Sequence, residues 1–411
     1  MDTQKIIKLD ANDKLAARRG LFNLPEGIIY LNGNSLGPLP FSVPQHLETV
    51  TNREWGEDLI SSWNRHGWID LPQRVGEKIA PLLGAEGGQV ICCDSISLNL
   101  FKLLAGSLQL RPGRTRLLTQ SDNFPTDLYV AQGLQQLLGD SRCQLESVEA
   151  DQLAAVLSDD VAVMLLSHVN FRDGAMHDMA ALTRMVHQRG ALVIWDLAHS
   201  AGVMPLQLDA WNVDFAVGCG YKFLNGGPGA PAFAYVNRRH HEKFTQPLWG
   251  WMGHKAPFEF GNDFIAAEGV NQFLTGTPSI LSLAALDAAL DCFVELELNQ
   301  LREKSLALGE CFLELMEQQP ALAEFVLVSP KEASRRGSQL SFAHPQAYAI
   351  CRAWADAGVI ADFRSPDLLR IGFSPLIVRF AEIEQAVLAL AEVVRNGTFR
   401  EARYQQRLKV T

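Results

Sequence analysis

The feature that most restricts the fold of this chain is a regular alternation of strand-length apolar runs with helical segments. Residues 161–169 and 191–196 form continuous apolar runs, and residues 179–190 between them have the spacing of an amphipathic helix that is closed by a glycine. Strands that are apolar on both faces must be covered on both sides, and helices that alternate with them supply that cover. We therefore predict an α/β fold with a mostly parallel central sheet and helices on both of its faces.

The length of the chain, 411 residues with 47% hydrophobic content, is sufficient for a large core and for two domains. We expect a large domain over residues 55–295, where the alternation lies, and a smaller α/β domain over residues 296–411. The N-terminal segment, residues 1–54, is expected to pack with the smaller domain and to contain a helix at residues 10–22.

Charge and cysteine content restrict the partners and the compartment of the protein. The net charge of -10 repels nucleic acid and anionic lipid, so we expect neither as a partner. The seven cysteines are scattered and contain no CxxC pair, which is typical of reduced cysteines in a cytoplasmic protein. The charged N-terminus predicts no signal peptide, and no apolar run approaches the length of a membrane span. No metal-ligand motif such as HExxH occurs, so we expect no metal site.

Two polar residues occur at the ends of apolar runs, where open parallel sheets bind their ligands. Asp196 ends one run, with His199 three residues later, and Lys222 lies in a glycine-rich turn between two further runs. Asp196 alone could cap the following segment, and Lys222 alone could extend its amine to water. A buried amine is otherwise costly unless it is paired or its charge is removed by a covalent bond.

Two further segments carry candidate ligand-binding residues. Ser95 and Ser97 begin a predicted helix, and the free N–H groups of a helix start bind phosphate well, although ordinary capping explains either serine equally. Phe124 precedes a proline in a loop, where an aromatic ring need not belong to the core. Asp127 follows in the first turn of the next helix, where an acid needs no other role.

Together these features match one ligand, pyridoxal phosphate. A lysine can hold this cofactor covalently, a carboxylate can keep its pyridine nitrogen protonated so that the ring accepts electrons, and a helix start can hold its phosphate. The other common phosphate motifs are missing, since the chain has no GxxxxGK[ST] and no GxGxxG between a strand and a helix. Aromatic residues in the segments SWNRHGW and GWMGH suit a pocket for an aromatic substrate.

Blocks of sequence over nearly the whole length resemble kynureninases, which are fold-type-I pyridoxal phosphate enzymes related to class V aminotransferases. In chain order, these blocks are YLNGNSLGPLP, SWNRHGW, DNFPTDLY, HVNFRDGAMHDM, WDLAHSAG, GCGYKFLNGGPG, GWMGH and LLRIGFSPL. The resemblance implies a central sheet of the seven-stranded type and the hydrolysis of L-kynurenine, or its 3-hydroxy form, between Cβ and Cγ. The products would be anthranilate, or 3-hydroxyanthranilate, and L-alanine, in tryptophan catabolism and NAD biosynthesis. Sequence leaves open which of the two substrates is preferred.

The resemblance also assigns roles at the cofactor. Lys222 would form the Schiff base, Asp196 would pair with the pyridine nitrogen, and Tyr221 would contact the phosphate and serve as a proton donor or relay. The other implied cofactor contacts within the same chain are Ile96, Ser97, Phe124, Asp127, Ser167 and His199.

Further roles concern the substrate and a second subunit. Trp251 and Thr277 match residues that reach the phosphate from the neighbouring subunit, which implies a homodimer with a shared site. Arg370 would bind the substrate carboxylate through its bidentate fork, although a structural salt bridge would also explain it. Ser35 and Trp63 would face the aromatic end of the substrate.

The alternatives are other enzymes of the same type or a protein that only binds ligand. A cysteine desulfurase needs a mobile, exposed cysteine, and the one late candidate, Cys351, lies in a helical, half-buried pattern. An aminotransferase would need a keto-acid partner. A non-catalytic protein would have lost a key group, whereas Lys222, Asp196 and Arg370 are all present.

Overall fold

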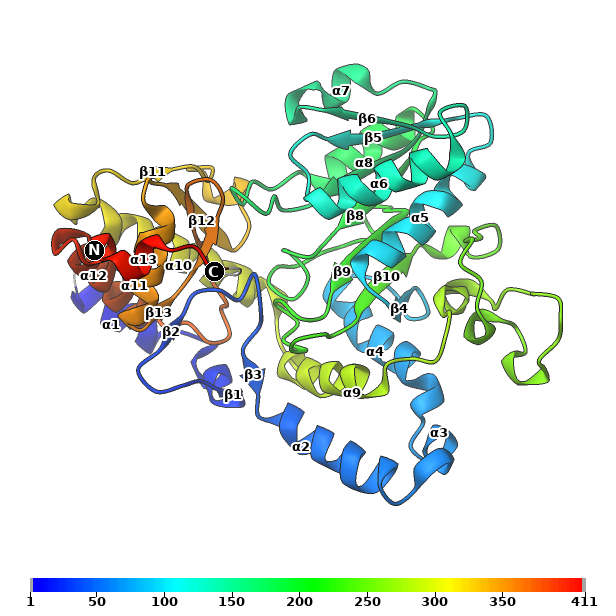
Figure 1. Ribbon diagram of the computed structural model, residues 1–411, viewed down its shortest axis with the longest axis horizontal. Coiled ribbons are helices and arrows are strands. Elements are labelled where there is room, and N and C mark those ends of the chain that lie inside the picture. Colours follow the sequence, from blue (N-terminus) through cyan, green and yellow to red (C-terminus); the bar gives the residue numbers. More distant parts are fainter. Residues whose placement is uncertain (1–2, 409–411) are drawn as a thin grey trace.

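The computed structural model describes residues 3–408, which form a large and a small lobe (Figure 1). The large lobe is built on a seven-stranded sheet in the order β4-β10-β9-β8-β7-β5-β6. Only β10 runs antiparallel to its neighbours, which confirms the predicted mostly parallel sheet. The strands are β4 (Val90–Cys92), β5 (Arg116–Gln120), β6 (Gln144–Val148), β7 (Val161–Ser167), β8 (Leu192–Asp196), β9 (Phe215–Cys219) and β10 (Ala232–Val236).

Both faces of this sheet are covered, as its apolar runs predict. Alternate residues of β7 enter different apolar clusters, with Val163 and Leu165 in one and Met164 and Leu166 in the other. Helices α5 (Ile96–Leu110) and α6 (Pro125–Leu138) contribute to the first cluster. The second cluster includes side chains of α4 (Leu71–Ile79), α8 (Met179–Gln188) and α9 (Ile280–Ala289). Each strand residue of β8 is therefore buried, whichever way it points.

The small lobe contains a four-stranded antiparallel sheet in the order β11-β12-β15-β14. Its strands are β11 (Val326–Leu327), β12 (Gln339–Ala343), β14 (Asp362–Arg364) and β15 (Leu368–Gly372). Its main helices are α10 (Leu298–Glu317), α11 (Ala347–Asp356) and α12 (Phe380–Arg395), followed by the short α13 (Ala402–Gln405). None of the helices in the described part of the chain is long and apolar enough to cross a membrane.

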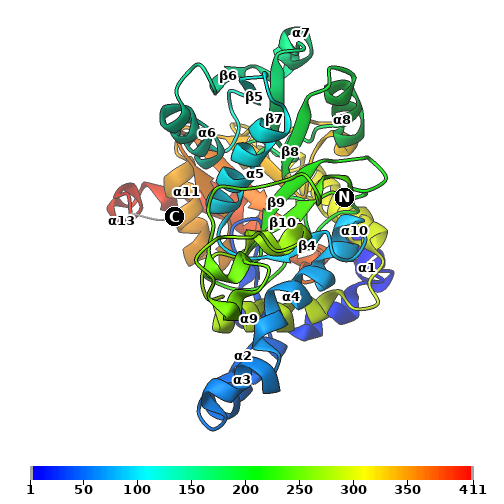
Figure 2. The same cartoon turned by 90° about the vertical axis from the view of Figure 1, so that its right-hand side faces the viewer.

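The N-terminal segment contacts both lobes. Helix α1 (Thr3–Ala11) packs on α12, and β2 (Ile29–Tyr30) pairs with β13 (Val359–Ile360), whereas α2 (Ser42–Thr49) packs on α9 of the large lobe. Strands β1 (Phe22–Asn23) and β3 (Leu39–Pro40) pair with each other. Helix α2 leads to α3 (Ser62–Arg65) in an arm that projects from the body of the molecule (Figure 2). The domain boundaries at residues 54/55 and 295/296 stay a prediction.

The helix predicted at residues 10–22 is wrong. Helix α1 ends at Ala11, and a separate 3₁₀ helix covers Ala16–Leu21. The break has a local cause, because the Asp13 side chain accepts a hydrogen bond from the backbone N–H of Leu15 at 2.9 Å. Such side-chain bonds offer the backbone an alternative to the helical pattern.

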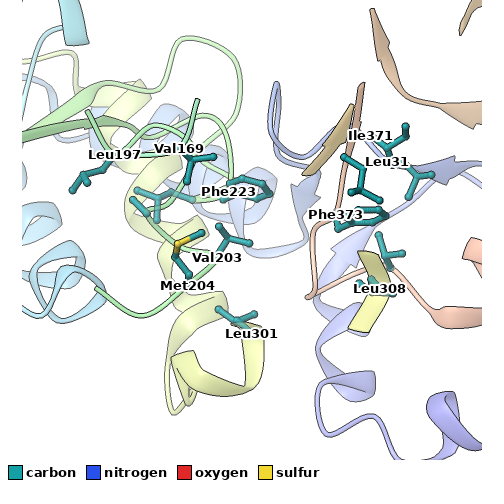
Figure 3. Close-up of a cluster of buried hydrophobic side chains, with 14 of the residues drawn as sticks. Leu31, Val169, Leu197, Val203, Met204, Phe223, Leu301, Leu308, Ile371 and Phe373 are labelled. Carbon is teal, nitrogen blue, oxygen red and sulfur yellow. The ribbon is translucent and has the colours of Figure 1, made fainter. Parts of the chain in front are cut away.

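An apolar cluster joins the two lobes beside the turn that carries Lys222 (Figure 3). Phe223, which follows Lys222, is 3% exposed. It belongs to the same apolar cluster as Phe373, which follows β15 of the small lobe, and Leu31 of the N-terminal segment. The lysine turn is therefore anchored at the junction of the lobes.

Candidate active site

A cavity of about 590 Å³ opens at the carboxyl ends of β7 and β8, next to the start of α5. It brings together many of the residues that the sequence singled out. Those that line it are Ile96, Ser97, Phe124, Ser167, Asp196, His199, Tyr221 and Lys222. Their convergence follows from topology, because the carboxyl ends of parallel strands meet at one edge of a sheet.

Lys222 is held by a tightly packed turn after β9. The backbone N–H of Gly37 donates to the carbonyl of Tyr221 at 2.8 Å, and a Cβ at Gly37 would lie 2.3 Å from the Lys222 carbonyl oxygen. Only glycine allows this approach. The Lys222 Nζ lies 5.9 Å from the centroid of the Phe124 ring. No carboxylate among the described residues lies within 4.0 Å of this Nζ, so the amine is not used in an ion pair.

Two buried carboxyl groups accompany the lysine. Asp196 is 4% exposed and accepts a hydrogen bond from the backbone of Ala198 at 2.7 Å, and Asp127 is fully buried. Burial raises the pKa of both groups, the charge of Asp196 raises that of Asp127 further, and the amine of Lys222 opposes the rise in each. Neither carboxylate oxygen of Asp127 has a hydrogen-bond partner among the described residues. This acidic pair fits a cationic heterocycle such as a protonated pyridine ring.

The start of α5 also lines the cavity. Ser95 caps this helix by accepting from the Leu98 N–H at 3.4 Å, so capping accounts for Ser95, whereas Ser97 lies inside the first turn. The first N–H groups of a helix have no intrahelical partner and bind anions. Asp94 also lines the cavity, and its carboxylate pairs with the ammonium of Lys102, a fully buried side chain. This neutralising pair was not predicted from sequence.

The aromatic and imidazole side chains are fixed by contacts from distant segments. Phe124 meets Phe171 edge to face, with ring centroids 5.2 Å apart. His199 Nδ1 lies 3.0 Å from Oε1 of Gln339 on β12 of the small lobe. Burial, followed by the charges of Lys222 and Arg370, holds the pKa of His199 well below its usual range. Phe171 and Gln339 were not identified from sequence, because only the fold brings them close.

Arg370 and Ser35 lie together outside the lining of this cavity. The Arg370 side chain is 1% exposed, pairs with Asp362, and donates to Ser35 Oγ at 2.7 Å and to the Phe171 carbonyl at 2.6 Å. Arg364 also pairs with Asp362, at 2.8 Å, so two guanidinium groups share one carboxylate. The Arg370 Nε is buried and has no partner among the described residues. Arg370 thus has a structural ion pair, and its role toward a substrate stays a prediction.

Three predicted residues lie elsewhere within the single chain. Thr277 lines a neighbouring cavity of about 300 Å³ that shares Asp94 and Ser95 with the first. Trp251 is 40% exposed, outside the first cavity, and contacts Phe258 with ring centroids 5.6 Å apart. Trp63 belongs to α3 in the projecting arm (Figure 2).

The cysteines argue against desulfurase chemistry. Cys351 is 5% exposed within α11, and burial raises its pKa to about 12. A buried thiol that holds its proton is neither mobile nor nucleophilic. All seven cysteines are buried and unpaired, as expected for reduced cysteines.

Comparison with curated proteins gives relatives that match almost end to end. A kynureninase of Deinococcus radiodurans is 48% identical over 399 residues, which cover 96% of this chain and 97% of the relative. A kynureninase of Pseudomonas fluorescens is 44% identical over 409 residues, which cover 98% of each protein. The chain belongs to the kynureninase family. The family model for the kynureninase C-terminal domain also matches, over residues 301–390.

Solved structures share the fold at low sequence identity. A cysteine desulfurase of Thermococcus onnurineus has a TM-score of 0.77 and 19% identity, covering 92% of this chain and 98% of the other. A C-DES mutant with glycine covalently linked to its PLP cofactor has a TM-score of 0.77 and 17% identity, covering 91% of this chain and 99% of the other. These similarities concern the fold alone, whereas the sequence relatives favour kynureninase over desulfurase.

Proposed function

We propose that this member of the kynureninase family hydrolyses the Cβ–Cγ bond of L-kynurenine, or of 3-hydroxy-L-kynurenine, with pyridoxal phosphate as cofactor. The products are anthranilate, or 3-hydroxyanthranilate, and L-alanine. The observation that carries the proposal is the 44–48% identity to kynureninases over nearly the full chain. The cavity lined by Lys222 and Asp196, with the carboxyl group of Asp127 buried close to Asp196, supplies the chemical groups that the reaction needs.

The residues present fit the cofactor. Lys222 would hold it covalently, and Asp196 would keep a proton on its pyridine nitrogen, with the buried carboxyl group of Asp127 nearby. Phe124 would stack on the ring. The remaining contacts proposed for the ring and the phosphate are Ile96, Ser97, Ser167, His199 and Tyr221. When bound, pyridoxal phosphate supplies an electron sink for the pair that is released at the substrate α-carbon.

The side chains around the substrate would bind it and move protons. Arg370 would bind the α-carboxylate, and the Lys222 amine would take the proton from Cα. A water molecule adds to the γ-carbonyl, the Cβ–Cγ bond breaks, and its electron pair stays on Cβ. Tyr221 would donate the proton to Cβ or relay it, and burial, which raises the pKa of its hydroxyl, leaves that proton in place at neutral pH. The oxygen of the water leaves in the new aromatic carboxylate.

A homodimer with a shared site is part of this proposal, as is a cytoplasmic location. Exposed aromatic side chains cluster near Trp251, with Trp249 64%, Phe258 61% and Phe260 73% exposed. Contiguous exposed apolar surface is typical of protein interfaces. A partner subunit on this face would explain why Trp251 is absent from the cavity of its own chain. Trp63 and Ser35 are proposed to face the aromatic end of the substrate in that assembly.

The test is the release of fluorescent anthranilate from L-kynurenine by the holoenzyme. We expect turnover by the wild type and a loss of about a thousandfold or more in Lys222→Ala, since this lysine is proposed to act as the base. The matched control is Lys243→Ala, which removes an exposed lysine and should retain activity. A wild-type holoenzyme that releases no anthranilate from either kynurenine or 3-hydroxykynurenine would refute the proposal. Parallel rates on the two substrates establish which is preferred.

A further inference from the structure

A further cavity, of about 670 Å³, also borders the candidate active site and has no assigned role; it is separate from the small cavity at Thr277 and is called the second cavity below. The two share the end of β7, because Ser167 lines the candidate active site and His168 lines the second cavity. The second cavity is formed by the start of α8, the segment before it, and residues Arg302 and Arg335 of the small lobe. It is therefore a separate space that abuts the wall of the active site.

The walls of this cavity are mostly apolar. They include Met176, Met179, Leu182, Met204 and Trp211. Figure 3 shows Met204 beside Val203, with Leu301 of α10 on the same side of the apolar cluster. Methionine side chains adapt to ligands of different shape and contact aromatic rings favourably. A cavity of this size and lining suits a small ligand with an apolar or aromatic body.

One charged group in the lining lacks a counter-ion. Arg302 donates from Nη2 to the carbonyls of Arg336 at 2.8 Å and Ala333 at 3.3 Å, while its buried Nη1 has no partner among the described residues. No carboxylate in the described part of the chain forms an ion pair with Arg302. Burial, and then the charge of Arg336, lowers its pKa to about 10, so it remains charged at neutral pH. A largely buried cation of this kind favours an anion beside it.

A second, independent group points to the same ligand chemistry. His168 is 4% exposed, its Nδ1 has no hydrogen bond of good geometry among the described residues, and the backbone of His177 only weakly opposes the fall in the pKa of the ring. Its ring lies close enough to Arg302 for the charge of the arginine to act on it. A buried polar atom without a partner is costly, and a ligand oxygen that accepts a hydrogen bond removes the cost.

We propose that this cavity binds a small organic acid with an apolar or aromatic body, whose carboxylate lies against Arg302 and His168. The exposed Arg335 adds positive charge to the lining. The one acid in the lining, Asp178, is exposed and already caps α8 by accepting from the Ala181 N–H at 2.9 Å. This site is distinct from the candidate active site, and its existence does not depend on the proposed function.

The test is calorimetric titration of the holoenzyme with phenylacetate, which combines an aromatic ring with a carboxylate. We expect saturable binding that Arg302→Gln weakens by about ten- to a hundredfold, since one charge-assisted interaction is lost. Ala181→Phe places an aromatic ring in the cavity and should abolish binding without removing a charge. The matched control is Arg184→Gln, which removes an exposed arginine from the same helix and should change affinity less than twofold.

Two results would overturn the proposal. One is the absence of saturable binding to the wild type. The other is equal affinity in the wild type, Arg302→Gln and Ala181→Phe, which would locate the ligand elsewhere, for instance in the candidate active site. Circular dichroism and retained anthranilate release show whether each variant is folded. If Arg302→Gln fails to fold, the affinity of Ala181→Phe for phenylacetate decides whether the ligand binds in this cavity, because that variant keeps the charge of Arg302.

Discussion

His199 and Gln339 connect the two lobes through a hydrogen bond of 3.0 Å between Nδ1 and Oε1. The amide nitrogen of Gln339 donates to the carbonyls of Phe171 at 3.3 Å and Asn170 at 3.4 Å, so its oxygen must face the imidazole. The ring of His199 is neutral, since burial and nearby cations lower its pKa. Nδ1 therefore carries the proton and Nε2 is an acceptor.

This arrangement predicts different effects for two substitutions at Gln339. Gln339→Leu removes the acceptor for His199 and for Asn34 Nδ2, and we expect the free energy of unfolding to fall by about 1–3 kcal/mol. Gln339→Glu keeps an acceptor but adds a carboxylate, which should raise the pKa of His199 and shift the acidic limb of the kcat profile upward by one pH unit or more. Urea unfolding and pH profiles measure the two effects. Gln188→Leu, at an exposed position, is the control, and a profile unchanged in Gln339→Glu would contradict the prediction that protonation of His199 limits kcat.

The central sheet was predictable because its signal is local. Strands β7 and β8 are continuous apolar runs, and both are buried on each face as that pattern requires. Strand β6 was not predicted, because it lies at the sheet edge and its residues Gln144–Val148 mix exposed and half-buried positions. An edge strand needs no continuous apolar run, so its pairing with β5 is decided by tertiary contacts.

The candidate site was predictable to the same extent. Asp196 is the last residue of β8 and Lys222 follows β9 of the same sheet, and topology brings such strand ends together. Gln339 lies 140 residues after His199, and nothing in the sequence near either residue indicates their contact. In the sequence, Lys102 is one residue within a predicted apolar helix. Only the structure shows that its amine forms an ion pair with the Asp94 carboxylate. Sequence order thus predicted groups that line the cavity, but not the residues that hold them in place.

The buried pair of Lys102 and Asp94 predicts a strong effect on stability. Lys102→Met leaves the Asp94 carboxylate without its partner beside the start of α5, and we expect the free energy of unfolding to fall by about 3 kcal/mol. The affinity for pyridoxal phosphate should fall about tenfold, because the uncompensated carboxylate lies where the phosphate is proposed to bind. Urea unfolding and cofactor titration measure both quantities. Lys8→Met, at an exposed position, is the control, and the double variant Lys102→Met/Asp94→Asn should recover part of each loss.

The guanidinium of Arg370 predicts a selective effect on substrate binding. In Arg370→Gln, Asp362 keeps its ion pair with Arg364, so we expect the protein to fold. KM for L-kynurenine should rise about ten- to a hundredfold with a smaller change in kcat, because a charge-assisted contact to the carboxylate is lost. Arg370→Lys should restore little, since an ammonium cannot form the bidentate contact. Steady-state kinetics decide, with Arg395→Gln as an exposed control. An unchanged KM would mean that Arg370 serves only its ion pair.

The buried imidazole of His168 predicts how stability depends on pH. Its side chain is 4% exposed, and burial, followed by the charges of His177 and Arg302, lowers its pKa to about 3. An unfolded histidine has a pKa of about 6.5, so below that pH the unfolded chain binds a proton that the folded chain does not. This contribution to stability is complete above about pH 6.5 and is lost as the pH falls toward 3, at up to about 1.4 kcal/mol per pH unit.

His168→Gln removes this titration but keeps a polar side chain of similar size. Between pH 6 and pH 4 its free energy of unfolding should fall about 2–3 kcal/mol less than that of the wild type. The contribution of His199 to the free energy of unfolding also falls as the pH falls, and His199 is unchanged in the variant. The free energy of unfolding will therefore still depend on pH in both proteins. Urea unfolding at pH 4, 5, 6 and 7 measures the difference, with His46→Gln on α2 as the control. Parallel curves for the wild type and His168→Gln would mean that His168 takes up its proton equally in the folded and unfolded chains, and that the wall between the two cavities does not hold it neutral.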